Sequence, residues 1–293
     1  MMFRTDYVAP ESLEELLAVL HQYGGEAKVI AGGTDLIPQM RAGQRSPKLL
    51  IDPQRLLQSG IAETKGSIHL GACLTHSQAL NSPLLQREYP ALVGACRQIG
   101  GPPVRNRGTL VGNLANASPA ADSAPPLLVF DAQIVVARLD GERVIPLNEF
   151  YLGPGQTQLA ADEFIHEIRI PKLPPRTIAI FLKLGKRQAM AIAVASVALR
   201  LSLNEGGHVT QARIALGSVA PTPMRAFQAE SILQSNPLDK ETIHLAAQAA
   251  RQAASPISDL RASAGYRAKM VAVLVGRALE LICNELAQEN AHG

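Results

Sequence analysis

The spacing of hydrophobic residues predicts a helix close to the start of the chain. Four leucines between positions 13 and 20 recur at helical intervals. Ser12 with Glu15 resembles a capping box, and the pair Gly24–Gly25 is typical of a helix end. Residues 28–31 (KVIA), apolar after Lys28, then predict a short buried strand. A glycine turn follows it and leads into a second helix over 36–42.

Short apolar or alternating runs continue through the first half and predict a mixture of strands and helices. We expect strands at 48–52, 67–71, 133–138, 144–146 and 164–170, and helices at 75–80 and 90–99. Residues 127–131 begin either a helix or a strand. Between these elements, residues 100–126 are dominated by Gly, Pro, Ala, Asn and Ser. Irregular stretches of this length are uncommon in compact domains and are often functional.

The proline-rich segment 171–175 marks a boundary, because the pattern changes after it. Strands are predicted at 178–184, 194–203 and 209–218, with a hairpin turn at 204–207. Helices are predicted at 225–235, 239–253 and 260–287. The second half is therefore expected to be a small antiparallel sheet covered by helices.

Composition excludes several classes of protein. The 293 residues are 47% hydrophobic and carry a net charge of only +3, and aromatic residues make up 4%. The scarcity of aromatic residues and of basic runs argues against nucleic acid as a partner. Cys73, Cys96 and Cys283 are dispersed, which argues against a disulfide framework or a metal site. No secretory signal or membrane span is visible, so a cytoplasmic protein is expected.

The segment Ala31–Leu36 (AGGTDL) has features of an anion-binding turn. Gly32 and Gly33 let the backbone approach a ligand closely, and the amides that follow them can bind phosphate. Thr34 can donate its hydroxyl proton, whereas Asp35 is expected to cap the helix or to bond the loop. The same residues also make an ordinary strand-to-helix turn, and taken alone the motif favours that interpretation. It is neither a Walker loop nor a GxGxxG fingerprint.

The segment Thr109–Asp122 (TLVGNLANASPAAD) places several fixed polar groups along a chain of small residues. Asn113, Asn116, Ser118 and Asp122 are the polar positions. An apolar loop with a few converging polar groups is typical of a site for a large, flat cofactor. The alternative is a buried loop whose side chains satisfy their own backbone.

These two segments resemble the two FAD-binding loops of the flavin subunits of molybdenum hydroxylases. That family includes the medium subunits of carbon monoxide dehydrogenases and of bacterial xanthine dehydrogenases, and the central domain of eukaryotic xanthine oxidoreductase. The segments 100–106 (GGPPVRN) and 217–223 (GSVAPTP) and the pair Tyr266–Arg267 also fit. The resemblance covers essentially the whole chain.

The resemblance implies an α+β fold of the vanillyl-alcohol-oxidase/PCMH-like type. An FAD-binding domain would span 1–173, in two subdomains of about 1–60 and 61–173. A C-terminal domain of a small antiparallel sheet and helices would span 177–287.

The resemblance also implies the cofactor contacts. The first loop would hold the FAD pyrophosphate, Asp122 would be an acidic ligand, and Lys183 would lie near the isoalloxazine ring. A lysine there would stabilise an anionic reduced flavin, while the alternative is a strand lysine that faces solvent. The full set of implied FAD contacts is Lys28, Val29, Ile30, Ala31, Gly32, Gly33, Thr34, Asp35, Leu36, Ile99, Thr109, Gly112, Asn113, Ser118, Asp122, Ile165 and Lys183. No catalytic residue or metal ligand is expected in this chain.

Two departures from the family pattern matter. Val111 stands where the family usually has a glycine, and valine would be strained if that position needs a positive φ. The dispersed cysteines argue against an additional iron–sulfur cluster of the kind one branch of the family carries. His69 and His76 are expected to be surface or helix-end residues, so FAD is expected to bind noncovalently.

As a member of this family the chain would transfer electrons. A large subunit would carry the molybdenum cofactor, and a small subunit two [2Fe–2S] clusters. The FAD of this chain would pass electrons from these clusters to NAD or another acceptor. Two alternatives are a degenerate, non-redox assembly subunit of the same fold and a free-standing flavin oxidase.

Overall fold

The computed structural model describes residues 5–56, 60–187 and 190–292 and forms two compact units. Unit 1 comprises 1–79, 101–117 and 132–172, and unit 2 comprises 80–100, 118–131 and 173–293. The segments 80–100 and 118–131 thus belong to unit 2, although in sequence they interrupt unit 1. Within the described residues, no helix combines the length and the apolar character that crossing a membrane requires.

Unit 1 begins with a small parallel sheet in the order β1 (Asp6–Val8), β3 (Leu49–Ile51), β2 (Ala27–Val29). Helix α1 (Leu13–Tyr23) connects β1 to β2 through the short 3-10 helix η1 (Gly24–Glu26), and Ser12 caps α1 as the sequence predicts. The turn after β2 leads into α2 (Leu36–Arg41). The first glycine loop therefore leaves the end of a parallel strand, where ligand sites of such sheets commonly lie.

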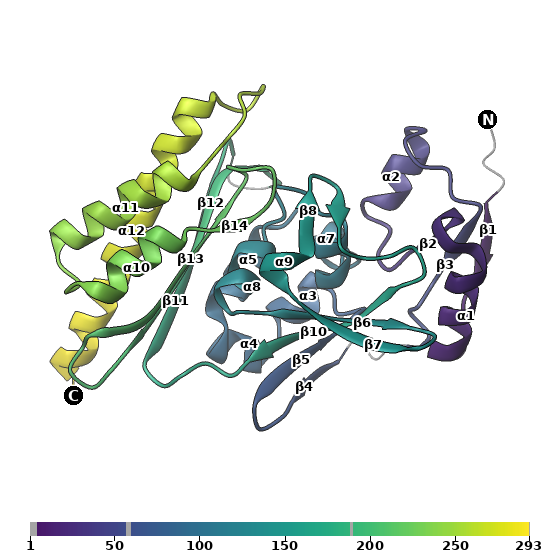
Figure 1. Ribbon diagram of the computed structural model, residues 1–293, viewed down its shortest axis with the longest axis horizontal. Coiled ribbons are helices and arrows are strands. Elements are labelled where there is room, and N and C mark those ends of the chain that lie inside the picture. Colours follow the sequence, from purple (N-terminus) through teal and green to yellow (C-terminus); the bar gives the residue numbers. More distant parts are fainter. Residues whose placement is uncertain (1–4, 57–59, 188–189, 293) are drawn as a thin grey trace. The chain divides into compact units, whose positions relative to one another are not determined.

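A five-stranded antiparallel sheet makes up most of the rest of unit 1 (Figure 1). Its order is β4 (Ile61–Glu63), β5 (Ser67–Gly71), β10 (Phe164–Pro171), β6 (Gln133–Arg138), β7 (Gly141–Pro146). The unit also contains the hairpin β8 (Tyr151–Gly153) and β9 (Gln156–Thr157), and the short helix α9 (Leu147–Phe150). Helix α3 (His76–Leu80) leads from unit 1 into unit 2.

Unit 2 is built on a four-stranded antiparallel sheet in the order β11 (Thr177–Gly185), β12 (Ala193–Leu203), β13 (Val209–Gly217), β14 (Met224–Arg225). Helices α10 (Phe227–Ser235), α11 (Lys240–Ala253) and α12 (Ala264–His292) cover one face, and α5 (Pro90–Gln98) and α8 (Ala124–Val129) contact the sheet as well (Figure 1). Helix α4 (Pro83–Glu88) precedes α5. Because helices cover it, every residue of β12 is buried, which explains its almost unbroken apolar sequence. The predicted α+β fold with a helix-covered C-terminal sheet is confirmed.

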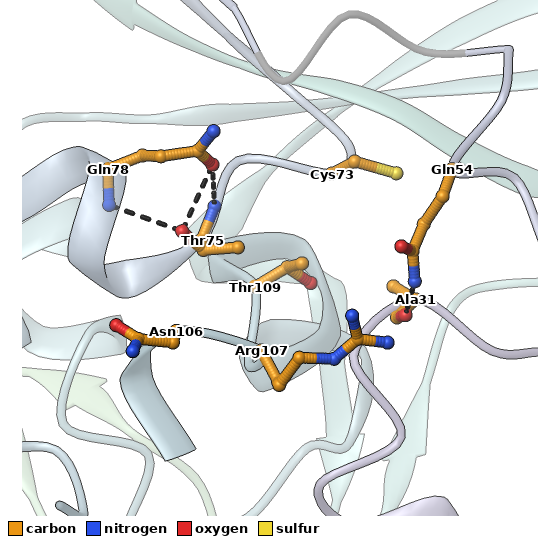
Figure 2. A pocket seen from close by; sticks show the side chains of 8 residues that line it. All are labelled: Ala31, Gln54, Cys73, Thr75, Gln78, Asn106, Arg107 and Thr109. Atoms are coloured by element: carbon orange, nitrogen blue, oxygen red, sulfur yellow. Dashed lines mark hydrogen bonds between the residues drawn. The ribbon is translucent and has the colours of Figure 1, made fainter. Parts of the chain in front are cut away.

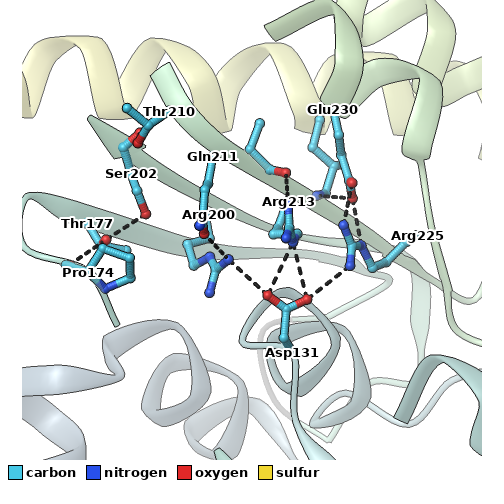
Figure 3. A network of polar contacts seen from close by, with 12 residues as sticks. Asp131, Pro174, Thr177, Arg200, Ser202, Thr210, Gln211, Arg213, Arg225 and Glu230 are labelled. Carbon is cyan, nitrogen blue, oxygen red and sulfur yellow. Dashed lines mark hydrogen bonds and ion pairs between the residues drawn. The ribbon is translucent and has the colours of Figure 1, made fainter. Parts of the chain in front are cut away.

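Asp131, which follows the C-cap residue Phe130 of α8, joins the sheet of unit 2 to its helices (Figure 3). Its carboxylate accepts hydrogen bonds from Arg200, Arg213 and Arg225 at 3.0–3.2 Å. Arg225 also pairs with Glu230 of α10. Asp131 holds a φ of +51°, a conformation that aspartate tolerates better than most residues.

The prediction of one long irregular segment over 100–126 is wrong. The structure has three short helices in that region: α6 (Pro102–Arg105), α7 (Leu110–Ala115) and the start of α8. Prolines occupy the first turn of α6 and α8, and Thr109 caps α7. Helices of four to six residues are too short to show a helical repeat, so the composition resembled a loop.

The last helix also differs from its predicted bounds of 260–287. It begins later, at Ala264, because Asp259 accepts hydrogen bonds from the amides of Arg261 and Ala262 and holds this stretch in a turn. Strand β14 was not predicted, since its two residues carry no pattern.

Candidate functional site

The first glycine loop in unit 1 presents a row of free backbone amides. The amide of Ile30 completes the parallel sheet by donating to Ile51 (2.8 Å), and the amide of Ile37 donates to Gly33 (3.1 Å). Between them, the amides of residues 31–36 donate to no described residue. Gly33 has a φ of +68°, which turns the chain so that the row can form. Such a row is suited to an anion.

A second segment of unit 1 lies directly against this loop. A β-carbon at Gly32 would stand 1.9 Å from the carbonyl oxygen of Arg107, so no side chain is possible there. A β-carbon at Gly108 would lie 3.3 Å from the hydroxyl of Thr34. The glycines at 32 and 108 therefore allow the two segments to cross in contact.

Thr109 starts α7 and fixes the position of the second segment. Its hydroxyl oxygen accepts a hydrogen bond from the amide of Gly112 (2.9 Å), while the amides of Leu110 and His76 bond to Leu74 and Gly108. Gly112 and Asn113 lie inside this helix. Val111 is helical and buried, and the positive φ falls on Ala117 instead. The expected strain at Val111 is thus absent.

A pocket of about 180 Å³ opens where these segments meet (Figure 2). It is lined by Ala31, Gln54, Cys73, Thr75, Gln78, Asn106, Arg107 and Thr109. This lining contains one cation and no carboxylate. The guanidinium of Arg107 has no partner among the described residues, and Figure 2 shows it directed toward Ala31. Such a site favours a negatively charged group.

Two other groups near the pocket remain uncharged at neutral pH. Burial, with a contribution from Asp52, raises the pKa of the Cys73 thiol to about 11. Burial, with Arg105 nearby, lowers the pKa of His76 to about 4. No thiolate therefore competes with a bound anion for Arg107, and no imidazolium competes with Arg107 for that anion.

Unit 2 contains a buried ion pair formed by two of the implied contacts. Lys183 of β11 donates to Asp122 Oδ2 (2.6 Å) and to the carbonyl of Gln98 (3.1 Å). The two side chains are only 4% and 9% exposed, so the alternative of a solvent-facing lysine is wrong. Burial raises the pKa of Asp122 to about 6 although Lys183 opposes this rise. The other oxygen, Oδ1, is buried without a hydrogen-bond donor among the described residues.

An unsatisfied buried acceptor is unfavourable by about 1–3 kcal/mol, so Asp122 is suited to receive a donor from a ligand. Ser118 lies in the turn before it and accepts from the amide of Ala120 (3.2 Å). Ile99, half-buried, follows the end of α5 in the same unit.

Apart from Ala31 and Thr109, the implied contacts lie outside the pocket lining. Lys28 and Val29 are half-buried in β2, and Ile165 is buried in β10 opposite Val136. Burial, followed by the nearby charge of Arg45, lowers the pKa of Lys28. Ala31 and Thr109 are the two implied contacts that line the pocket itself, and Leu36 opens α2.

The structure corrects the expectations for Asp35 and His69 and confirms that for His76. Asp35 occupies the position before α2, but its side chain makes no capping hydrogen bond. His76 is a helix-end residue as expected, since it begins α3, and it is buried there. His69 is neither at the surface nor at a helix end, because it lies half-buried in β5 with Nδ1 2.9 Å from Glu167.

Six pocket residues could not be identified as such from the sequence: Gln54, Cys73, Thr75, Gln78, Asn106 and Arg107. Arg107 carries the strongest sequence signal of these, since it directly follows the segment 100–106 that resembles the family. Gln54, whose side-chain amide donates to the carbonyl of Ala31, carries no local signal. In the described ranges, no group of three or more His, Cys, Asp or Glu side chains could hold a metal ion.

Both halves of the chain match models of known protein families. Residues 1–173 match the model of the FAD binding domain in molybdopterin dehydrogenase, and residues 180–282 match the CO dehydrogenase flavoprotein C-terminal domain. The chain is 36% identical over 278 residues to the carbon monoxide dehydrogenase medium chain of Hydrogenophaga pseudoflava, covering 94% of this chain and 96% of that one. It is 32% identical over 257 residues to the xanthine dehydrogenase FAD-binding subunit of Escherichia coli O157:H7, covering 87% and 88%.

A solved structure agrees with these matches. Carbon monoxide dehydrogenase from Hydrogenophaga pseudoflava, in a form that lacks the Mo-pyranopterin moiety of its molybdenum cofactor, superimposes with a TM-score of 0.91 at 36% identity, covering 96% of this chain and 98% of that chain. The two glycine-containing loops, the α+β fold and these matches all indicate the same family. The chain belongs to the family of FAD-binding medium subunits of molybdenum-containing dehydrogenases.

Proposed function

We propose that this chain is the electron-transfer subunit of a molybdenum-containing hydroxylase. It would receive electrons from [2Fe–2S] clusters in a small partner subunit and deliver them to NAD or another acceptor. The large partner subunit would hold the molybdenum cofactor and oxidise the substrate. The observation that carries the proposal is the row of amides over 31–36, which donate to no described residue. This row lies in contact with the backbone of Arg107 and borders a pocket whose lining contains no carboxylate.

The residues of unit 1 fit the central part of a dinucleotide. Free amides and the Arg107 guanidinium would neutralise the pyrophosphate, and the hydroxyls of Thr34 and Thr109 can donate to its oxygens. A volume of about 180 Å³ is below the ~300–1,000 Å³ typical of a complete ligand site, so the pocket would take one portion of FAD.

The residues of unit 2 fit a ring that carries hydrogen-bond donors. Asp122 Oδ1 would accept from an N–H of the flavin, and Lys183 would hold the carboxylate in place through Oδ2. When bound, FAD supplies an acceptor and donor of one or two electrons. The buried Asp122–Lys183 pair would set the local electric field without adding net charge.

The structure weakens the alternative of an assembly subunit that has lost FAD. Val111 was its one support, and Val111 lies without strain in α7. A chain released from binding a cofactor would have no reason to keep the free amides, the close glycine contact and the unpaired carboxylate oxygen together.

The first test is the visible spectrum of the purified full-length chain before and after acid precipitation. We expect flavin absorption near ~450 nm and FAD in the supernatant, because no covalent link is proposed. A chain that stays colourless, and that takes up no FAD even with its partner subunits, would overturn the proposal. Anaerobic addition of NADH to the FAD-loaded complex then tests the acceptor: bleaching supports NAD, and an unchanged spectrum assigns another acceptor.

A further inference from the structure

Ser218 connects two parts of unit 2 through its backbone. It directly follows β13, and its amide donates to the carbonyl of Pro119 (2.8 Å). Its own carbonyl accepts from the guanidinium of Arg267 (2.9 Å). Pro119 belongs to the turn that immediately precedes Asp122. The turn is closed by a hydrogen bond from the amide of Ala121 to Ser118 (3.0 Å).

The conformation of Ser218 is unusual for its residue type. Its φ is +64°, a region that residues with a β-carbon rarely adopt. Its side chain is buried, and its hydroxyl has no hydrogen-bond partner among the described residues. Strained backbone of this kind persists where surrounding contacts impose it and often occurs at functional sites.

Arg267 is one of the contacts that hold Ser218 in place. This arginine lies in the first turn of α12 and is 3% exposed. One nitrogen donates to the carbonyls of both Val194 and Ser218, and another donates to Asp259 (2.6 Å). A buried guanidinium with three acceptors holds its partners in one geometry, because its planar donors are fixed relative to each other.

A second close contact fixes the other side of Asp122. A β-carbon at Gly217 would stand 2.4 Å from the Ser196 hydroxyl and 3.0 Å from Pro125, the second residue of α8. The sheet therefore touches the chain both before and after Asp122.

We propose that Ser218 and Arg267 are positioning residues that fix the turn 118–121 and so present Asp122 and Lys183 to the flavin. The proposal rests on the proposed function, since it assumes that FAD is the ligand of Asp122. Neither residue needs to touch the cofactor. Arg267 holds the Ser218 carbonyl by a hydrogen bond. The Ser218 amide in turn holds Pro119, and this fixes the position of Asp122.

Two substitutions at position 218 separate the backbone from the hydroxyl. Ser218→Gly removes the hydroxyl but accepts a positive φ, so FAD affinity should stay within about twofold of wild type. Ser218→Val keeps a β-carbon and adds branching that disfavours a positive φ, so the amide should move away from Pro119. We expect Ser218→Val to weaken FAD binding at least tenfold.

Arg267→Met should act in the same direction as Ser218→Val, and Arg267→Lys should give an intermediate result because one donor is kept. Arg261→Gln is the matched control. Arg261 bonds to the same Asp259 but is exposed and does not reach Ser218.

The measurements are made on the full-length chain loaded with FAD, at a temperature where every variant is folded by circular dichroism. They are the FAD dissociation constant, the shape of the ~450 nm band and the two-electron midpoint potential. A merely structural role would lower the unfolding temperature and leave the potential unchanged. Displacement of Asp122 should change the preference for reduced over oxidised flavin by about tenfold, which is a shift of about 30 mV.

The outcomes separate this inference from the proposed function. If wild-type chain binds FAD while folded Ser218→Val, Arg267→Met and Arg267→Lys keep its affinity, spectrum and potential, the positioning role is wrong and the proposed function stands. If wild type itself binds no FAD, the proposed function fails first. Should Ser218→Val and Arg267→Met not fold, Arg267→Lys against Arg261→Gln decides the question.

Discussion

Gly32 and Arg107 lie so close that a methyl group on Gly32 would stand 1.9 Å from the Arg107 carbonyl oxygen. No rotamer change relieves that clash, because the obstacle is backbone. The contact joins the loop with the free amides to the segment that supplies the pocket cation. A substitution at Gly32 is therefore the most direct test of the proposed pyrophosphate site.

Gly32→Ala should abolish detectable FAD binding, because the two segments must separate to admit the β-carbon. Isothermal titration with FAD and a thermal unfolding scan would measure the effect. The control is Gly94→Ala in α5, where a β-carbon meets nothing within 4 Å. Alanine at that helical position should stabilise the protein by about 1 kcal/mol. Normal FAD affinity in folded Gly32→Ala would contradict the proposed role of the crossing.

Arg107→Met should weaken FAD binding about 10- to 100-fold, since a charged hydrogen bond to phosphate contributes about 1.5–3 kcal/mol. Binding by wild type should also weaken as salt is added, and the variant should lose much of that dependence. Arg41→Met, at the end of α2, serves as a control for the loss of one surface charge. Equal affinities for Arg107→Met and Arg41→Met would remove Arg107 from the site.

The affinity for FAD should depend on pH through Asp122. A donor from the flavin would stabilise the ionised carboxylate, whose pKa burial raises to about 6 in the free chain. The association constant should therefore rise with pH up to about 6 and level off above it, by up to tenfold per unit on the rising side. Fluorescence titrations between pH 5 and 8 test this, and Asp122→Asn should give a flat profile. A wild-type profile as flat as that of the variant would mean that the ionised carboxylate is not a ligand.

In the ligand-free chain, ionisation of Asp122 should have the opposite effect. Raising the pH should lower the stability of the fold, whereas it strengthens the binding of FAD. The folded state holds the Asp122 proton more tightly than the unfolded state, where the pKa is near 3.8. The free energy of unfolding contributed by this group should thus fall as the pH rises from about 4 to about 6. Urea unfolding of wild type and Asp122→Asn across this range isolates the contribution as the difference between the two curves. A constant difference would show that the carboxyl does not titrate there.

Asp131→Asn should destabilise unit 2, because three arginines converge on that carboxylate (Figure 3). Arg200 and Arg225 are buried but the Asp131 side chain is 36% exposed, so the loss should be below the ~3–5 kcal/mol of a fully buried pair, at about 1–3 kcal/mol. Asp140→Asn breaks an exposed pair with Arg138 and should change stability by less than about 1 kcal/mol. Chemical unfolding of both variants compares the two environments directly. Equal losses would show that the Asp131 network is no stronger than a surface pair.

Regular strands and long helices could be predicted from the sequence because their pattern is local. Strand β12 and helix α11, for example, have bounds within one residue of those expected. The short helices α6 and α7 could not be predicted in this way. Proline residues start α6 and a threonine cap starts α7, and neither helix is long enough to show a hydrophobic repeat.

The residues of the candidate site could likewise be predicted only where the signal is local. Glycine at positions 32 and 33 could be recognised as a sign of close backbone approach, but the segment that approaches lies about 75 residues later. The pairing of Asp122 with Lys183 spans 61 residues, and its burial depends on helices and strands packed around it. Such long-range contacts leave no trace in local spacing, which is why the resemblance to a family, rather than the pattern, indicated Lys183.

The assignment of 80–100 and 118–131 to unit 2 has a consequence for synthesis on the ribosome. Helices α5 and α8 leave the exit tunnel well before strands β11–β13, against which they pack. Until those strands emerge, the apolar faces of both helices have no partner from their own unit. The packing of α5 and α8 cannot be completed before the strands of the second half have been synthesised. Folding should therefore be completed only late in translation. Chaperones would be expected to bind the nascent chain during that interval.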